Sequence, residues 1–286
     1  MKSPALDVPR SGQTSNVGLL VGLAIVGIIA AVAMLGPALM AQDAFTQDLN
    51  QRLIPPAWMD GRPEHWLGTD GLGRDYLARL AYGARISLLI GLITAVISGV
   101  IGTTLGVLGG FFGGRIDDAV LFVITCRLSI PVVLVALAVV GLLGSSLPLV
   151  FLTLSLLLWD RFAVVARAST MQVRTLDYLS AARCAGCSTF HLLFREVLPN
   201  IGPHLAVVAT LEMALAILLE ATLSFLGLGV PPPLPSWGLM IAEGKDYMFF
   251  SPWVIMIPGA ALSVLVLGIN LVGDGLRDFL GTEKLR

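Results

Sequence analysis

The sequence has few charged residues and few cysteines for its length. Asp, Glu, Lys and Arg make up 13% of its 286 residues, about half of the roughly 25% that is usual in soluble domains. The formal net charge is −1, so the chain has no basic field of the kind that nucleic-acid binding requires. Three cysteines do not suggest a disulfide framework. With 56% hydrophobic residues, this composition indicates an integral membrane protein.

The sequence also lacks the short motifs of common catalytic sites. It contains no Gly-x-x-x-x-Gly-Lys-Ser/Thr loop for ATP phosphates, no His-Glu-x-x-His zinc helix and no Gly-x-Ser-x-Gly nucleophile elbow. Cys184-x-x-Cys187 followed by His191 has the spacing of a redox pair or of part of a metal site. A fourth ligand is missing nearby, so we interpret the cysteines as small residues beside a turn glycine. We predict neither an enzyme nor a metal site.

Long uncharged runs predict membrane-spanning helices, which need about 20 apolar residues each. The first run, Val17–Ala41, holds 25 residues, whereas the apolar core of a signal peptide holds only about 7–15. We therefore predict an uncleaved first span. Further spans are predicted at Ile86–Gly114, Ala119–Leu143, Leu149–Val165, Leu205–Val230 and Trp253–Gly273. The predicted fold class is all-α, with six transmembrane helices.

Charge in the loops predicts the orientation of the chain. An even number of spans places both termini on one side, and basic residues concentrate on the cytoplasmic side. The Arg167–Arg195 segment is basic, whereas Gln42–Arg85 has more acids than arginines. We predict a multi-pass protein of a bacterial-type inner membrane with both termini cytoplasmic. The predicted parts are a tail (1–16), span one (17–41), an extracytoplasmic segment (42–85), a core with the other spans (86–273, including a cytoplasmic loop at about 168–204) and a second tail (274–286).

The stretch before the second predicted span has a helical period. Apolar residues recur at Tyr76, Leu77, Leu80 and Ala81 within Arg74–Ile86. We expect this stretch to form an amphipathic helix that lies flat on the outer membrane surface and then enters span two.

A polar interruption between predicted spans four and five carries a distinctive pattern. Ser180-Ala181-Ala182-Arg183-Cys184-Ala185-Gly186 is followed twelve residues later by Leu198-Pro199. We expect a short helix over Leu176–Cys184 and a turn with φ > 0 at Gly186. A second helix is expected over Thr189–Leu198, with the proline helping to end it. The small residues of the first helix would let a partner protein approach closely.

This pattern resembles the cytoplasmic coupling loop of ABC-importer permeases, which reads Glu-Ala-Ala, three residues, Gly, nine residues, then Ile-x-Leu-Pro. Ser180 stands where that motif has Glu, and the later Gly and Leu-Pro are kept. Other blocks resemble the second (C-type) permease of the dipeptide/oligopeptide/nickel group, and together they cover most of the chain. These blocks are Gly68–Asp75, Gly83–Leu88, Glu196–Asn200, Glu220–Gly229, Pro235–Gly238 and Asn270–Asp278.

The resemblance implies a type I ABC importer permease fold, with a five-span core and an extra N-terminal span. It implies a heterodimer with a homologous second permease, two cytoplasmic ABC ATPases that bind ATP and Mg, and an extracytoplasmic solute-binding protein. No cofactor is expected on this chain. The implied substrates are di- or oligopeptides, with nickel, glutathione, an opine or another small solute as alternatives. The implied ATPase-coupling residues are Ser180, Ala181, Ala182, Gly186, Leu198 and Pro199.

Alternatives of another class are a self-contained secondary transporter or channel and a membrane enzyme, although no nucleophile–base arrangement is visible.

Two acids in predicted span five are candidates for lining the translocation path. Glu212 and Glu220 lie about 80° apart on a helix, and intramembrane acids usually face a cavity or a partner. Either path lining or helix packing explains Glu212, whereas packing is favoured for Glu220 near the span end. Asp160 and Arg161 are placed near the end of span four, where snorkelling explains their charge.

Overall fold

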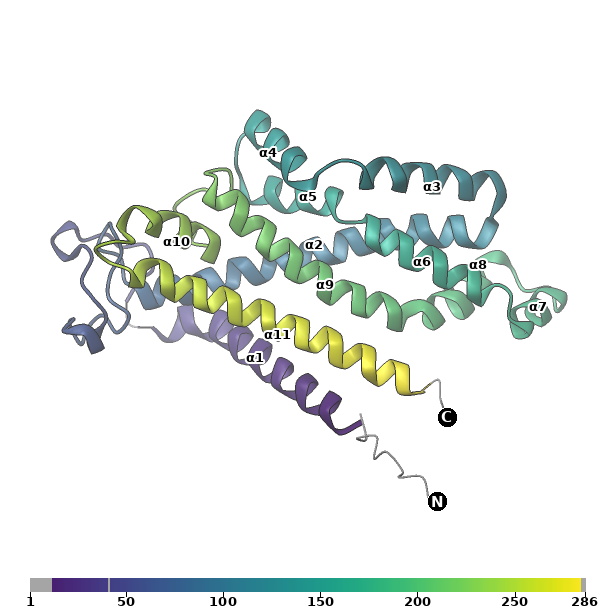
Figure 1. Ribbon diagram of the computed structural model, residues 1–286, viewed down its shortest axis with the longest axis horizontal. Helices are drawn as coiled ribbons and strands as arrows, with labels where there is room; N and C mark the ends of the chain where they lie inside the picture. The colour runs from purple at the N-terminus through teal and green to yellow at the C-terminus, as the bar shows by residue number, and fades with distance from the viewer. Residues whose placement is uncertain (1–11, 41, 284–286) are drawn as a thin grey trace, which may run out of the picture.

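The computed structural model describes residues 12–40 and 42–283, and within them the chain is helical (Figure 1). The described residues form no strand, only an isolated bridge between Thr69 and Asp75. The predicted all-α class is therefore confirmed. The helices are α1 Gly12–Leu39, α2 Tyr76–Phe112, α3 Gly114–Leu128, α4 Val132–Leu143, α5 Leu147–Leu157, α6 Asp160–Val173, α7 Asp177–Cys184, α8 Thr189–His191, α9 Leu198–Phe225, α10 Trp237–Gly244 and α11 Trp253–Glu283, with 3-10 turns at Leu49–Gln51, Ala57–Met59 and Lys245–Tyr247 and a π-helix at Leu192–Val197.

Five stretches among the described residues are long and apolar enough to cross a membrane: Val17–Leu39, Tyr76–Phe112, Leu147–Val173, Thr189–Phe225 and Trp253–Leu280. A sixth crossing exists only if α3 and α4 count as one span, and these two helices bend by 79° at their junction. The predicted span Ala119–Leu143 is therefore divided between two helices with a sharp bend and is not one straight helix. Pro131 has no N–H and disfavours helical geometry in the residue before it, so α3 ends at Leu128 and α4 begins after the proline.

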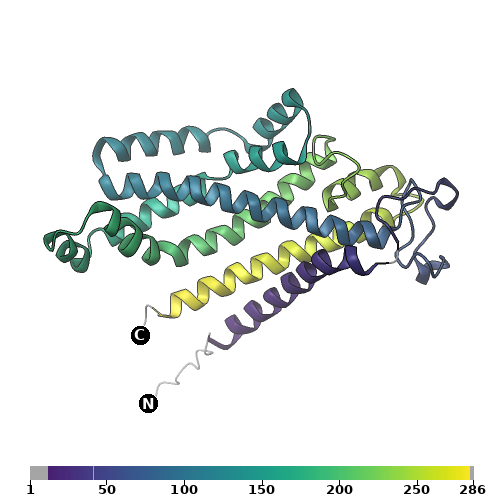
Figure 2. The ribbon, with the colours of Figure 1, turned by 180° about the vertical axis from the view of Figure 1, so that it is seen from behind.

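The two ends of the molecule differ in structure. In Figures 1 and 2 the helices run lengthwise, and the irregular segment 42–75 covers one end. The start of α1, the end of α11 and the short helix α7 all lie toward the opposite end. Charge predicts that the loop near Ser180 lies on the same side as the termini. In the structure it lies at the same end as the start of α1 and the end of α11.

Helix α2 contains both the expected surface helix and the second predicted span in one unbroken run. It runs unbroken from Tyr76 to Phe112, and Asp75 caps it by accepting a hydrogen bond from the Ala78 N–H at 2.8 Å. Tyr76 and Arg79 are buried, and so is Ala78, which lies on the opposite side of the helix from Tyr76. The expected amphipathic surface helix is therefore wrong, because α1, α10 and α11 and the segment 42–75 cover this first part of α2.

Glycines bring α2 and α6 into backbone contact. A methyl group added at Gly102 would lie 2.2 Å from the Trp159 carbonyl oxygen, and one at Gly106 would lie 2.4 Å from that of Ala163. Gly110 repeats the pattern one turn later. Small residues at every fourth position lie on one face of a helix and permit this approach. The two helices therefore pack as one body.

We predict that Gly106→Val destabilises the protein by about 1–3 kcal/mol, because the new side chain overpacks the α2–α6 contact. Thermal unfolding of the purified membrane protein measures the effect. Gly27→Ala is the matched control, because no atom lies within 4 Å of a methyl group added there. Equal unfolding temperatures for the two variants would contradict the close packing.

Candidate functional site

The predicted coupling loop forms a helical tip at the end of the molecule opposite segment 42–75 (Figure 1). Helix α7 ends in two hydrogen bonds, from the Cys187 N–H to the Ala182 oxygen at 3.1 Å and from the Gly186 N–H to the Arg183 oxygen at 3.0 Å. This pattern needs a left-handed residue, and Gly186 has φ +83°. The predicted helix and glycine turn are confirmed. A methyl group on Gly186 would meet no atom within 4 Å, so this turn faces open space.

The loop residues singled out in the sequence divide into two groups. Ser180, Ala181 and Gly186 are exposed on the tip. Ala182 and Leu198 are half-buried and pack on the apolar core beneath the loop. The first group is available to a partner, whereas the second holds the loop in place.

Pro199 does not end a helix, contrary to expectation. The chain runs from α8 through the π-helix Leu192–Val197 directly into α9, and Pro199 lies in the first turn of α9. The Leu198 N–H donates to the Leu193 oxygen, five residues back. Inside an α-helix proline clashes with the carbonyl four residues before it. The wider π-helical turn relieves this conflict, and such turns are frequent at functional sites.

Two arginines attach the tip to the end of α2. Arg174 Nη1 donates to the Gly110 carbonyl oxygen at 3.0 Å, and the Arg183 guanidinium lies 4.9 Å from the centre of the Phe111 ring. Leu179 of α7 is fully buried in the same cluster as Phe111. Sequence reasoning missed these residues because the contacts join segments more than 60 positions apart. The only signal was one arginine before α7 and another in its last turn.

Tyr178 makes a second link, from α7 to α9. Its hydroxyl accepts a hydrogen bond from Asn200 Nδ2 at 3.1 Å. Partial burial, together with the nearby charge of Glu196, raises the pKa of Tyr178, so the hydroxyl stays protonated at neutral pH.

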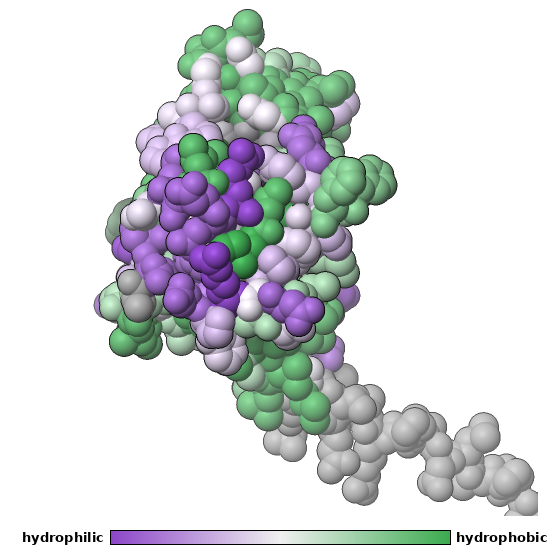
Figure 3. Space-filling model, turned by 90° about the vertical axis from the view of Figure 1, so that its left-hand side faces the viewer, coloured by the Kyte–Doolittle hydropathy of each residue, from purple (hydrophilic) through white to green (hydrophobic). Residues whose placement is uncertain are grey.

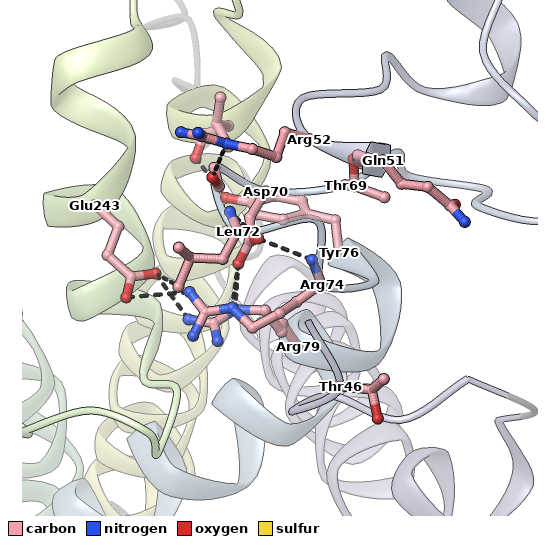
Figure 4. Close-up of polar contacts among 12 residues, drawn as sticks. Thr46, Gln51, Arg52, Thr69, Asp70, Leu72, Arg74, Tyr76, Arg79 and Glu243 are labelled. Atoms are coloured by element: carbon pink, nitrogen blue, oxygen red, sulfur yellow. Dashed lines mark hydrogen bonds and ion pairs between the residues drawn. The ribbon is translucent and has the colours of Figure 1, made fainter. Parts of the chain in front are cut away.

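At the other end of the molecule, four charged side chains form a closed network (Figure 4). Asp70 Oδ2 lies 2.6 Å from Arg74 Nε and 3.2 Å from Arg79 Nε. Glu243 Oε2, on α10, lies 2.8 Å from Arg79 Nη2 and 3.2 Å from Arg74 Nη2. Arg79 is fully buried, and a buried charge persists only when it is paired. The network joins the start of α2 to α10.

Further polar contacts fold segment 42–75 into a cap. His65 bridges Asp75 Oδ2 and Gln51 Oε1, with nitrogen–oxygen distances of 2.8 Å. The Tyr76 hydroxyl donates to the Val254 carbonyl oxygen on α11. Figure 3 shows that hydrophilic residues gather on this end of the molecule, with apolar residues around them. The exposed charged residues of the cap include Asp43, Arg52, Asp60, Arg62 and Glu64.

Glu220 lies at the junction of α9 and α10. Its Oε1 accepts hydrogen bonds from the hydroxyls of Ser224 and Ser236, each at 2.7 Å. Ser236 also caps α10 by accepting from the Leu239 N–H at 3.0 Å. The carboxylate therefore fixes the start of α10 on α9.

Glu212 forms an ion pair with Arg161, at 3.3 Å between Oε1 and Nη1. The Glu212 side chain is 0% exposed and that of Arg161 is 58% exposed. Arg161 lies in the first turn of α6 and near the middle of the span Leu147–Val173. The predicted end of that span at Val165 was too early, so snorkelling at a span end does not account for Arg161.

An apolar groove of about 800 Å³ runs along α2 and α9. Phe162 of α6 and Met213 of α9, the neighbours of Arg161 and Glu212 in sequence, both line it. Arg161 and Glu212 themselves are not among the residues that line it. Its other lining residues include Val96, Val100, Leu205 and Ala209.

Comparison with known proteins places these features in a family. Residues 102–284 match the sequence profile described as "Binding-protein-dependent transport system inner membrane component". The di/tripeptide transport system permease protein DppC of Pseudomonas aeruginosa is 42% identical, over 93% of this chain and 88% of the relative. The dipeptide transport system permease protein DppC of Escherichia coli is 41% identical, over 93% and 89%. The oligopeptide transport system permease protein OppC of Bacillus subtilis is 35% identical, over 95% and 87%.

The same fold occurs in a solved transporter. A chain in an inward-facing structure of the MetNI methionine ABC transporter aligns with a TM-score of 0.56 at 19% identity, covering 68% of this chain and 93% of that chain. Likeness at this identity concerns the fold alone. It confirms the predicted importer-permease fold.

We predict that Asp70→Asn destabilises the protein by about 3 kcal/mol, because it leaves the buried Arg79 with one acid fewer. Asp60→Asn is the control, since Asp60 is an exposed residue of the same cap with φ +63°, a conformation that Asn tolerates. Thermal unfolding of both variants measures the difference. A normal unfolding temperature for Asp70→Asn would show that the network adds little to stability.

Proposed function

Because the chain belongs to the family of binding-protein-dependent transport system inner membrane components, we propose that it forms half of the path of a peptide importer. The chain is the permease component of an ABC importer, and ATP hydrolysis takes place on partner subunits. The observation that carries the proposal is the exposed tip at Ser180–Gly186, firmly attached to α2 and α6. Peptides are proposed as substrates because relatives named as di/tripeptide, dipeptide and oligopeptide permeases match along nearly the whole chain.

The two ends would serve different partners. The tip and both tails (1–16 and 274–286) face the cytoplasm, where one of two ABC ATPases, carrying ATP and Mg, docks on Ser180, Ala181 and Gly186. The folded cap and the loop Pro231–Ser251 face outward and receive the solute-binding protein. A homologous second permease completes the path beside the core of this chain (86–273). The polar, charged surface of the cap suits docking of a soluble protein.

The contacts around α7 suggest how movement passes from the ATPase to the path. Displacement of α7 would act through Arg174 and Arg183 on the Gly110–Phe111 end of α2. Since α2 and α6 are in backbone contact, they would move together. The π-helix Leu192–Val197 lies on the opposite branch of the loop and would absorb the change of angle toward α9. The outcome is a two-state tilt biased by the nucleotide state of the ATPase.

Purification of the tagged chain in mild detergent tests the proposed assembly. We expect a second permease and ABC ATPases to co-purify, with ATPase activity in the eluate. Recovery of the chain alone, stable and active in transport by itself, would favour the secondary transporter or channel.

We predict that Gly186→Trp abolishes transport while the chain still inserts in the membrane. A large side chain at this open turn would block the ATPase surface and would be strained at φ +83°. Gly186→Asn is the control, because Asn tolerates positive φ and adds little bulk. Uptake by the Trp variant within twofold of the wild type would refute docking at this turn.

We predict that Arg174→Gln lowers the amount of peptide transported per ATP hydrolysed by at least threefold, because the tip loses its hydrogen bond to α2. Co-purification of the partners should be unchanged. Arg115→Gln, which removes an exposed arginine from α3, should leave the ratio unchanged. Parallel measurements of uptake and hydrolysis in proteoliposomes decide the result, and an unaltered ratio would count against this route of coupling.

A further inference from the structure

Arg161 combines a buried partner with an exposed charge. On the buried side, Arg161 Nη1 lies 3.3 Å from Glu212 Oε1, and the Glu212 side chain is 0% exposed. The Arg161 side chain is 58% exposed, so much of its five-donor guanidinium fork faces outward. The residue lies near the middle of a candidate membrane span. The ion pair with Glu212 therefore fixes the position and direction of the guanidinium. The remaining N–H donors of Arg161 are left for another group.

The exposed side of Arg161 is unsuited to lipid. An arginine at the bilayer centre is costly, and such residues face water-filled cavities or partners. Val164, one turn further along α6, is 44% exposed. Phe162 between them lines the groove along α2 and α9. The exposed charge of Arg161 near the middle of the span therefore favours an aqueous path beside this part of α6 over hydrocarbon.

The surrounding charges favour an anion at this place. The acids Glu212 and Asp160 are buried at 0% and 7% exposure, so a ligand would meet the guanidinium and not the carboxylates. Arg127 is the other base nearby, and it donates to the Leu157 carbonyl oxygen where α5 ends. Arg161 also lies in the first turn of the 14-residue helix α6, whose N-terminus favours negative charge.

We propose that Arg161 binds the carboxylate of a peptide as it passes through the membrane, with Glu212 as the residue that positions it. The inference rests on the proposed function, since peptides with a free C-terminus supply this carboxylate. The guanidinium fork matches a carboxylate in a bidentate geometry that lysine cannot copy. The site would hold the peptide weakly, in keeping with a step from which the substrate must leave.

The first test measures transport by the complete complex in proteoliposomes. Arg161→Gln is expected to lower uptake of a free-acid tripeptide at least tenfold, with ATPase activity stimulated by the binding protein remaining within twofold of the wild type. Arg161→Lys should recover part of the uptake. Unchanged uptake by Arg161→Gln would overturn the proposal. Failure of the wild-type complex to transport any peptide would instead refute the proposed function.

The second test reports on ligand and solvent directly. Val164→Cys is made after Cys126, Cys184 and Cys187 are replaced by Ser, and the complex is treated with a membrane-impermeant thiosulfonate. We expect labelling that slows at least threefold when free-acid tripeptide, loaded binding protein, ATP and vanadate are present. The tripeptide amide should not protect, nor should the free acid in an Arg161→Gln background.

Two outcomes of this labelling would overturn the proposal. Reaction only with a lipid-soluble thiol reagent would place this face against lipid or a second protein. Equal protection by the acid and the amide, or protection that survives Arg161→Gln, would show that the peptide passes without using the guanidinium.

Discussion

The approach of α2 to α6 at Gly102, Gly106 and Gly110 is the constraint on which the rest of the structure depends. Carbonyl oxygens of α6 occupy the space that side chains would need, so the two helices cannot slide or separate without losing contacts along several turns. Helix α6 leads into the tip on which an ATPase is proposed to dock, and α2 leads from the cap. One rigid pair therefore connects the two surfaces that partners are proposed to use.

Charge is used differently at the two ends of this pair. At the cap, Asp70, Arg74, Arg79 and Glu243 pair with one another in a closed group of ion pairs. At the tip, single arginines reach to a carbonyl oxygen and to an aromatic ring. This group resists rearrangement because breaking a pair would leave a buried charge, such as that of Arg79, without its partner. The looser contacts at the tip suit a surface that must respond to a moving partner.

The sequence was sufficient for the features that depend on local chemistry. Uncharged runs predicted the helical membrane class, and Gly186 predicted its own positive φ. It failed where neighbours in space decide the outcome. Arg74–Ile86 has the period of a surface helix, but α1, α10 and α11 cover it. Pro199 predicts the end of a helix, but the helical path continues through the π-helix Leu192–Val197 into α9. The contact of Arg183 in the tip with Phe111 joins segments that are distant in the sequence, and no local sequence pattern predicts it.

The π-helix divides the long helical segment from Thr189 to Phe225 into two parts whose side chains follow different registers. A turn with i→i−5 hydrogen bonds holds an extra residue, so the regular spacing of side chains is out of phase before and after it. Residues before the turn, toward the proposed ATPase surface, and residues after it, toward the proposed path, thus do not share one helical stripe. Substitutions in the stripe toward the proposed path can therefore adapt it to another substrate without changing the direction of the stripe toward the proposed ATPase surface.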